Sequence, residues 1–200
     1  MFALGCALII SRERILEAAA RVYSRHGFRG ATTRLIAAEA GVNEVTLFRT
    51  FGSKGALLEA VLEENDDTGD GTNPLPNPPL DPERELTEWV ETHLSRIRNL
   101  RPMLIHAISE YEERPEVAGF ACRGRVDVHQ HISEYVARLH DLGLADRDAD
   151  VAAAVTMLIS SVMSDAMGRP MAPHTFPPSD QASARYVRCF LRMIGAPRSR

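Results

Sequence analysis

The stretch GVNEVTLFRTFGSK, residues 41–54, decides how the N-terminal part of this chain folds. Gly41 is a residue type that ends helices and Asn43 is a good N-cap, so together they predict a turn followed by a new helix. Gly52 ends that helix, and another one opens at Lys54, the only lysine in the chain. A cation in the first turn of a helix opposes the helix dipole by roughly 0.3–1 kcal/mol. The position therefore calls for a negative partner.

Apolar residues at helical spacing continue on both sides of this stretch. We expect Leu35, Ile36 and Leu47 to face a core, and Thr32 or Thr33 to cap the helix before the turn. The helices predicted in this part of the chain cover residues 11–27, 33–40, 43–51 and 53–64. Three helices in a short span, the second and third joined by a turn, are typical of a helix-turn-helix.

Residues 15–64, ILEAAARVYSRHGFRGATTRLIAAEAGVNEVTLFRTFGSKGALLEAVLEE, resemble the DNA-binding domain of the tetracycline-repressor (TetR) family. The resemblance is carried by HGF at the end of the first helix, TT before the second, IAAEAGV, and then TLF..F and GSK..LL at the spacing of the family. It implies an all-α protein in which a helix-turn-helix domain precedes a larger helical ligand-binding and dimerisation domain. It also implies a homodimeric transcriptional regulator, most often a repressor, that a small molecule releases from palindromic operator DNA.

The geometry of the major groove selects the candidate DNA contacts. A recognition helix enters the groove by its N-terminal end, and the start of the preceding helix crosses the phosphate backbone. We therefore predict the following DNA-binding residues: Thr33, Arg34, Asn43, Glu44, Val45, Thr46, Phe48, Arg49 and Lys54. A DNA phosphate at the helix opened by Lys54 would supply the negative partner that this lysine needs. The alternatives are helix capping for Thr33 and ordinary solvation for Arg34 and Lys54.

Two positions depart from the family pattern. Relatives commonly carry a tyrosine where Phe48 stands, and that hydroxyl typically reaches a phosphate, so this contact is expected to be lost. Glu44 would meet phosphates badly, and its carboxylate could instead accept from the amino group of a cytosine or cap its own helix. We favour the capping interpretation.

The charge of the chain is unevenly distributed. Residues 1–55 carry eight basic and four acidic side chains, which leaves −8 for the rest of a chain of net charge −4. A basic module on an acidic body suits local binding of nucleic acid, although a solvated charge pattern would look the same.

The rest of the chain is predicted to form a second helical domain. Residues 1–10 are an apolar N-terminal extension, 11–64 the DNA-binding domain, and 65–82 an acidic loop rich in proline and glycine. The second domain covers residues 83–200. Its predicted helices span residues 83–100, 102–112, 116–142, 148–167 and 182–194, for a total of about nine.

The last two helices carry wide apolar stripes that suit both a core and a second subunit. A four-helix bundle across a two-fold axis would make the protein a homodimer, and the alternative is two core helices of a monomer. The predicted interface residues are Val155, Leu158, Ile159, Val162, Tyr186, Phe190 and Leu191.

A pocket for an unknown small-molecule effector is expected among the middle helices, lined by aromatic, sulfur and imidazole groups. The candidates are Trp89, His93, Met103, His106, Tyr111, Phe120, Tyr135 and Met157. His129 and His131 do not suggest a metal site, because residues two apart on a helix point in nearly opposite directions. No metal or cofactor is predicted.

The remaining signals point to a cytoplasmic protein without catalytic activity. The apolar N-terminus lacks the basic start and the cleavage site of a signal peptide, the run 151–163 is short for a membrane span, and Cys6, Cys122 and Cys189 are expected to be free thiols. No GxSxG, HExxH or phosphate-loop motif occurs, and serines beside Asp165 suit close helix packing. The competing hypotheses are a helix-turn-helix protein that acts only through a protein partner, and an enzyme built from scattered residues.

Overall fold

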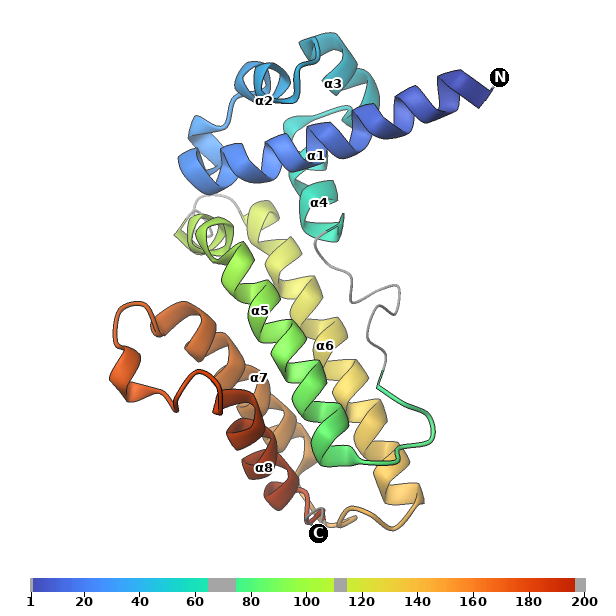
Figure 1. The fold of residues 1–200 in the computed structure, drawn as a ribbon, viewed down its shortest axis with the longest axis vertical. Coiled ribbons are helices and arrows are strands. Elements are labelled where there is room, and N and C mark those ends of the chain that lie inside the picture. The colour runs from blue at the N-terminus through green and yellow to red at the C-terminus, as the bar shows by residue number, and fades with distance from the viewer. Residues whose placement is uncertain (1, 65–74, 110–114, 197–200) are drawn as a thin grey trace. The chain divides into compact units, whose positions relative to one another are not determined.

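The computed structural model describes residues 2–64, 75–109 and 115–196, with the backbone alone for residues 2–11, 62–64, 115–127 and positions 59 and 107. The described residues form eight α-helices and one short 3₁₀ helix and contain no strand (Figure 1). The helices are α1 (Phe2–Gly30), α2 (Thr33–Ala40), α3 (Glu44–Phe51), α4 (Lys54–Glu64), α5 (Pro82–Ser109), α6 (Pro115–Asp141), α7 (Val151–Gly168), η1 (Pro173–Thr175) and α8 (Ala182–Met193). The predicted all-α class is confirmed.

The chain divides into two compact units. Unit 1 contains Met1–Asp67 together with Pro102–Arg123, and unit 2 contains Thr68–Arg101 together with Gly124–Arg200. The long helices α5 and α6 each contribute residues to both units. Each unit is described by itself below.

Unit 1 owes its helix-turn-helix to the caps that the sequence indicates. The Thr32 side chain accepts a hydrogen bond from the Leu35 backbone N–H, and Asn43 does the same for Thr46, so each caps the helix that follows it. Gly41 ends α2 in the left-handed conformation, with φ 66° and ψ 33°, where a side chain would be strained. The predicted turn and its two caps are confirmed.

The core of unit 1 lies between α1 and the three short helices. Ile15, Ala18 and Ala19 of α1 are fully buried, as are Ile36 and Leu47. These contacts hold α2 and α3 in a fixed arrangement against α1. Leu35 was expected to face this core, but it is 38% exposed.

Helix α1 differs from the prediction at its start. It begins at Phe2 rather than at Ser11, because the residues after Gly5 are all compatible with a helix and a serine alone does not start one. At the predicted stop, Gly27 leaves the helical conformation with φ 64° and kinks the helix, which continues to Gly30. The ring of His106 lies beside it, with Nδ1 only 2.9 Å from where a Cβ would stand, so any larger residue at Gly27 would collide with the imidazole.

Helix α5 runs through a proline that was expected to end it. The prediction of two helices, 83–100 and 102–112, is wrong, and one helix of 28 residues contains Pro102. Proline removes one backbone hydrogen bond, but buried side chains on both sides of it, Leu94 and Met103, hold the helix in place. The described residues therefore contain eight α-helices rather than about nine. Helix α7 also begins later than expected, at Val151, because Asp150 rather than Asp148 provides the cap.

Unit 2 is built around one hydrophobic core shared by α5, α6, α7 and α8. Fully buried members include Leu86, Ile132, Val155 and Phe190. Helix α7 is long and apolar enough by composition to cross a membrane, with a mean hydropathy of 1.5. Its buried side is nevertheless part of this core.

A buried carboxylate ties three helices of unit 2 together. Asp165 of α7 is completely buried and accepts hydrogen bonds from Arg98 of α5 at 3.0 Å, from the Arg169 Nε at 2.7 Å, and from the Tyr186 hydroxyl of α8 at 2.7 Å. Burial alone would raise the pKa of Asp165, but the hydrogen bonds from Arg169, Tyr186 and Arg98 outweigh it and hold the pKa below its ordinary value.

Candidate nucleic-acid interface

Helix α3 presents one face outward and one residue inward. Leu47 is fully buried, whereas Val45 is 74% exposed and Phe48 is 45% exposed. At about 100° per residue, Val45, Phe48 and Arg49 fall within an arc of about 100° on the side opposite Leu47. Arg49 is also exposed. The helix therefore offers a surface of two apolar side chains and one guanidinium.

Two of the predicted base-contacting residues bind to each other. The Asn43 Oδ1 accepts from the Thr46 backbone N–H at 2.7 Å and from the Thr46 hydroxyl at 2.8 Å. These bonds satisfy a backbone donor at the start of α3. The Asn43 side-chain oxygen and the Thr46 hydroxyl hydrogen are thereby engaged within the protein.

Thr33 and Glu44 are also joined. The Thr33 hydroxyl, at the first residue of α2, donates to the Glu44 carboxylate, at the first residue of α3. Glu44 thus connects the two helices of the motif, a role that the sequence did not indicate because the two residues are eleven positions apart in the chain. Asn43, not Glu44, is the N-cap of α3.

Arginines give the surface its positive charge. Arg34 and Arg49 are exposed, and within the described part of the chain neither guanidinium forms an ion pair. Other arginines of α1 lie against the motif itself, since the Arg12 guanidinium is 5.8 Å from the centre of the Phe51 ring and Arg14 lies beside Gly41. Arg21 pairs with Glu39 of α2 at 3.0 Å.

Lys54 has an acceptor inside the protein. Its ammonium donates to the backbone carbonyl of Phe28 near the end of α1 and lies 4.1 Å from the centre of the Phe28 ring. The Tyr23 hydroxyl in turn donates to the Lys54 carbonyl at 3.0 Å. The first residue of α4 therefore places its charge at the C-terminal end of α1, where the helix dipole favours a cation. The start of α4 is capped by Ser53, which accepts a 3.0 Å hydrogen bond from the Ala56 N–H.

The predicted effector-pocket residues belong to both units of the chain. In unit 2, Trp89 and His93 stack with ring centres 3.6 Å apart, and the buried Tyr135 donates to Glu85. In unit 1, Met103 is buried and His106 lies against Gly27. Tyr111 lies outside the described residues, and Phe120 lies in α6 with its side chain outside them. Met157 is 57% exposed on α7.

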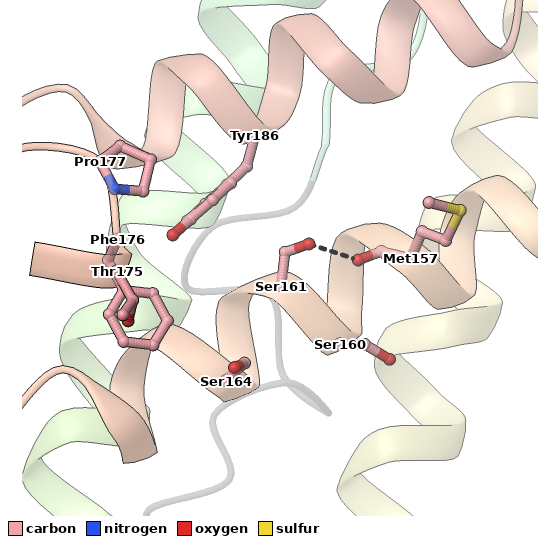
Figure 2. A pocket seen from close by; sticks show the side chains of 8 residues that line it. All are labelled: Met157, Ser160, Ser161, Ser164, Thr175, Phe176, Pro177 and Tyr186. Carbon is pink, nitrogen blue, oxygen red and sulfur yellow. Dashed lines mark hydrogen bonds between the residues drawn. The ribbon is translucent and has the colours of Figure 1, made fainter. Parts of the chain in front are cut away.

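Met157 lines a shallow groove of about 420 Å³ on the outer side of α7 (Figure 2). Figure 2 shows the hydroxyls of α7 on one side and the residues before α8 on the other. The lining residues are Met157, Ser160, Ser161, Ser164, Thr175, Phe176, Pro177 and Tyr186. The sequence predicts that the serines permit close helix packing, but Ser160 and Ser164 are exposed, and all three serines line this groove. In the described residues, no group of three His, Cys, Asp or Glu side chains could hold a metal ion.

The predicted dimer-interface residues lie in the core of their own chain. Val155, Leu158, Ile159, Val162, Phe190 and Leu191 belong to the core of unit 2, and Tyr186 packs against it. The side of α7 that remains exposed is uncharged and carries Ala153, Thr156, Met157, Ser160 and Ser164.

The N-terminal sequence matches known proteins. Residues 15–61 match the family model described as bacterial regulatory proteins, tetR family. The chain is 42% identical over 55 residues to the uncharacterized HTH-type transcriptional regulator YvkB of Bacillus subtilis, which is 28% of this chain and 29% of YvkB. It is 43% identical over 54 residues to the HTH-type transcriptional repressor SCO4008 of Streptomyces coelicolor, which is 27% of this chain and 28% of that protein. The chain thus spans less than a third of the length of these curated relatives.

The fold is similar over nearly the whole chain to solved structures. Salmonella enterica GusR superposes with a TM-score of 0.76 at 18% identity, covering 93% of this chain and 96% of that one. At this identity the likeness concerns the fold alone, and it includes the helical part beyond residue 64.

Proposed function

We propose that this chain, whose residues 15–61 match the tetR family of bacterial regulatory proteins, is a cytoplasmic transcriptional repressor that binds operator DNA as a homodimer. The observation that carries the proposal is the outward face of α3, where Val45, Phe48 and Arg49 stand opposite the buried Leu47. A short helix such as α3, which is capped by Asn43 and Gly52 and presents such a face, can enter a major groove.

The contacts divide into two kinds. Arg34, at the second residue of α2, and Arg49 would reach phosphates or guanine edges, because guanidinium groups suit both. Val45 and Phe48 would meet base edges. The bonded pairs Asn43–Thr46 and Thr33–Glu44 keep α2 and α3 in position, so these four of the predicted DNA-binding residues act mainly on the geometry of the motif.

Dimerisation would use the exposed side of α7. Its uncharged surface of Ala153, Met157, Ser160 and Ser164 suits close approach of the same helix from a second copy. Two-fold symmetry then places the two recognition helices in half-sites about 34–36 Å apart, or a multiple of that distance. A small molecule bound to unit 2 would release the operator if it favoured the state that cannot bind DNA. A preference of about 1–3 kcal/mol would reduce operator affinity roughly 5- to 150-fold.

The test is selection from a random duplex library with the full-length protein. We expect enrichment of an inverted repeat, and binding that weakens as salt rises because phosphate contacts release counterions. The variant Arg49→Ala should lose most of the enrichment, whereas Arg147→Ala, an exposed arginine of unit 2, should retain it. If no sequence is enriched and the affinity for duplex DNA is independent of salt, the protein is not a DNA-binding regulator.

A helix-turn-helix that acts only through a protein partner is the second candidate. It is favoured by the missing hydroxyl at Phe48 and by the carboxylate of Glu44 on the DNA-facing end of α3. The same selection separates the two, because this candidate predicts no enriched sequence from a folded protein.

A further inference from the structure

The outward face of α3 is unusually apolar for a helix proposed to read bases. Val45 is 74% exposed, and Phe48, one turn further along, is 45% exposed. Their neighbour Leu47 fills the core, and Val45 is the more exposed of the two side chains. Arg49 on the same face supplies the charge that draws a polyanion toward them.

The polar side chains around this pair are engaged elsewhere. Asn43 Oδ1 and the Thr46 hydroxyl bond to each other, and the Thr50 hydroxyl donates to the Thr46 carbonyl at 2.8 Å. Glu44 accepts from Thr33. A base contact by any of these groups would have to compete with a bond that caps or connects the helices. Val45 and Phe48 have no such competing role.

Base pairs offer one apolar group to the major groove. This group is the C5-methyl of thymine, since the other base edges there are hydrogen-bond donors and acceptors. We propose that Val45 is a specificity-determining residue that recognises a thymine methyl in each operator half-site, with Phe48 widening the apolar surface beside it. The inference rests on the proposed function and adds the class of sequence that is bound, an A·T pair opposite Val45.

Deoxyuridine provides the test, because it pairs with adenine as thymine does and lacks only the methyl group. The duplex obtained by selection is synthesised with each thymine replaced in turn by deoxyuridine, and affinities are measured by fluorescence anisotropy. At one position per half-site we expect affinity to fall about fourfold, and about 15-fold when both half-sites are replaced, as for loss of one buried methyl group each.

The variant Val45→Ala should bind the thymine and deoxyuridine duplexes equally. Because Val45 is exposed, this truncation leaves the core intact, which circular dichroism can verify. The matched control is Leu80→Ala, which truncates a side chain that is 81% exposed in unit 2 and should leave the discrimination unchanged.

Two results would overturn the inference while leaving DNA binding in place. The wild-type protein could bind every deoxyuridine duplex as tightly as its thymine parent, or Val45→Ala could retain the full discrimination. Failure of the proposed function is a different outcome, since selection would then yield no preferred duplex at all.

Discussion

At the scale of single residues, Lys54 finds within the fold the hydrogen-bond acceptor that its position in the sequence requires. A lysine at the first position of α4 opposes that helix's dipole, but its ammonium reaches the Phe28 carbonyl at the end of α1. The sequence could predict that a partner was needed. It could not identify this one, because the proximity of residues 28 and 54 follows from the packing of α1 against α4.

Replacing Lys54 with methionine should lower the free energy of unfolding. The variant keeps the length of the side chain but loses a charged hydrogen bond, which contributes about 1.5–3 kcal/mol in a partly buried setting. Urea denaturation measures the change. Arg34→Met is the matched control, an exposed cation of the same unit, and should leave stability within about 0.5 kcal/mol.

The opposite results would indicate that Lys54 contacts a DNA phosphate, as predicted from the sequence. In that case Lys54→Met would unfold like the wild type, and the slope of log affinity against log salt would fall by about 0.9 per subunit.

Glu44→Gln tests whether this residue reads a base. The glutamine oxygen can still accept from Thr33, so we expect a stability loss below about 1 kcal/mol, an unchanged selected sequence, and slightly tighter binding to all duplexes as repulsion from phosphates is relieved. Parallel selections with both proteins provide the measurement. A preference that relaxes at one C·G pair per half-site, by about 1–3 kcal/mol, would show instead that Glu44 contacts cytosine.

At the scale of helices, capping residues and glycines in the sequence predicted most helix boundaries. They did not predict the boundaries that depend on packing against other helices. The caps Thr32, Asn43 and Ser53 act within three residues, so a sequence pattern contains them. Pro102 is a local signal for the end of a helix, but α5 continues through it, with Leu94 and Met103 buried on either side. The candidate surface was predictable to the same extent: α3 and its exposed face follow from the pattern, but the bonding of Thr33 to Glu44 does not.

The buried Asp165 yields a prediction about pH. Asp165→Asn leaves Arg98 and Arg169 without their counter-charge and should lower the free energy of unfolding by about 3–5 kcal/mol at neutral pH. The pKa of Asp165 is lower in the folded protein than in the unfolded chain, so its stabilisation is present above the unfolded pKa and is lost as the pH falls through the folded pKa.

The difference in stability between the wild type and Asp165→Asn should therefore stay constant from about pH 5 to 8 and shrink only below about pH 4. Chemical denaturation at several pH values measures it. A difference that disappears between pH 5 and 7 would mean that burial outweighs the arginines and raises this pKa.

At the scale of the whole molecule, the apolar stripes of α7 and α8 could not reveal which side faces a partner. A stripe of given width suits either a core or an interface, and the residues chosen from it, such as Leu158 and Phe190, are buried in their own chain. A charge at either position is expected to unfold unit 2 rather than to separate subunits.

Ser160→Arg places a charge on the exposed side of α7 and should convert a dimer into folded monomers, visible by sedimentation velocity. Ser95→Arg introduces the same charge on the exposed side of α5 and should leave the dimer intact. A Ser160→Arg variant that sediments as a stable dimer would place the interface on another surface.

The proposed dimeric operator-binding function is tested most directly by titrating the full-length protein with the selected inverted repeat and with a duplex that contains one half-site. We predict two chains per inverted repeat, far weaker binding to the single half-site, and log affinity that falls linearly with log salt. Equal affinity for the inverted repeat, the half-site and a random duplex would contradict the proposal.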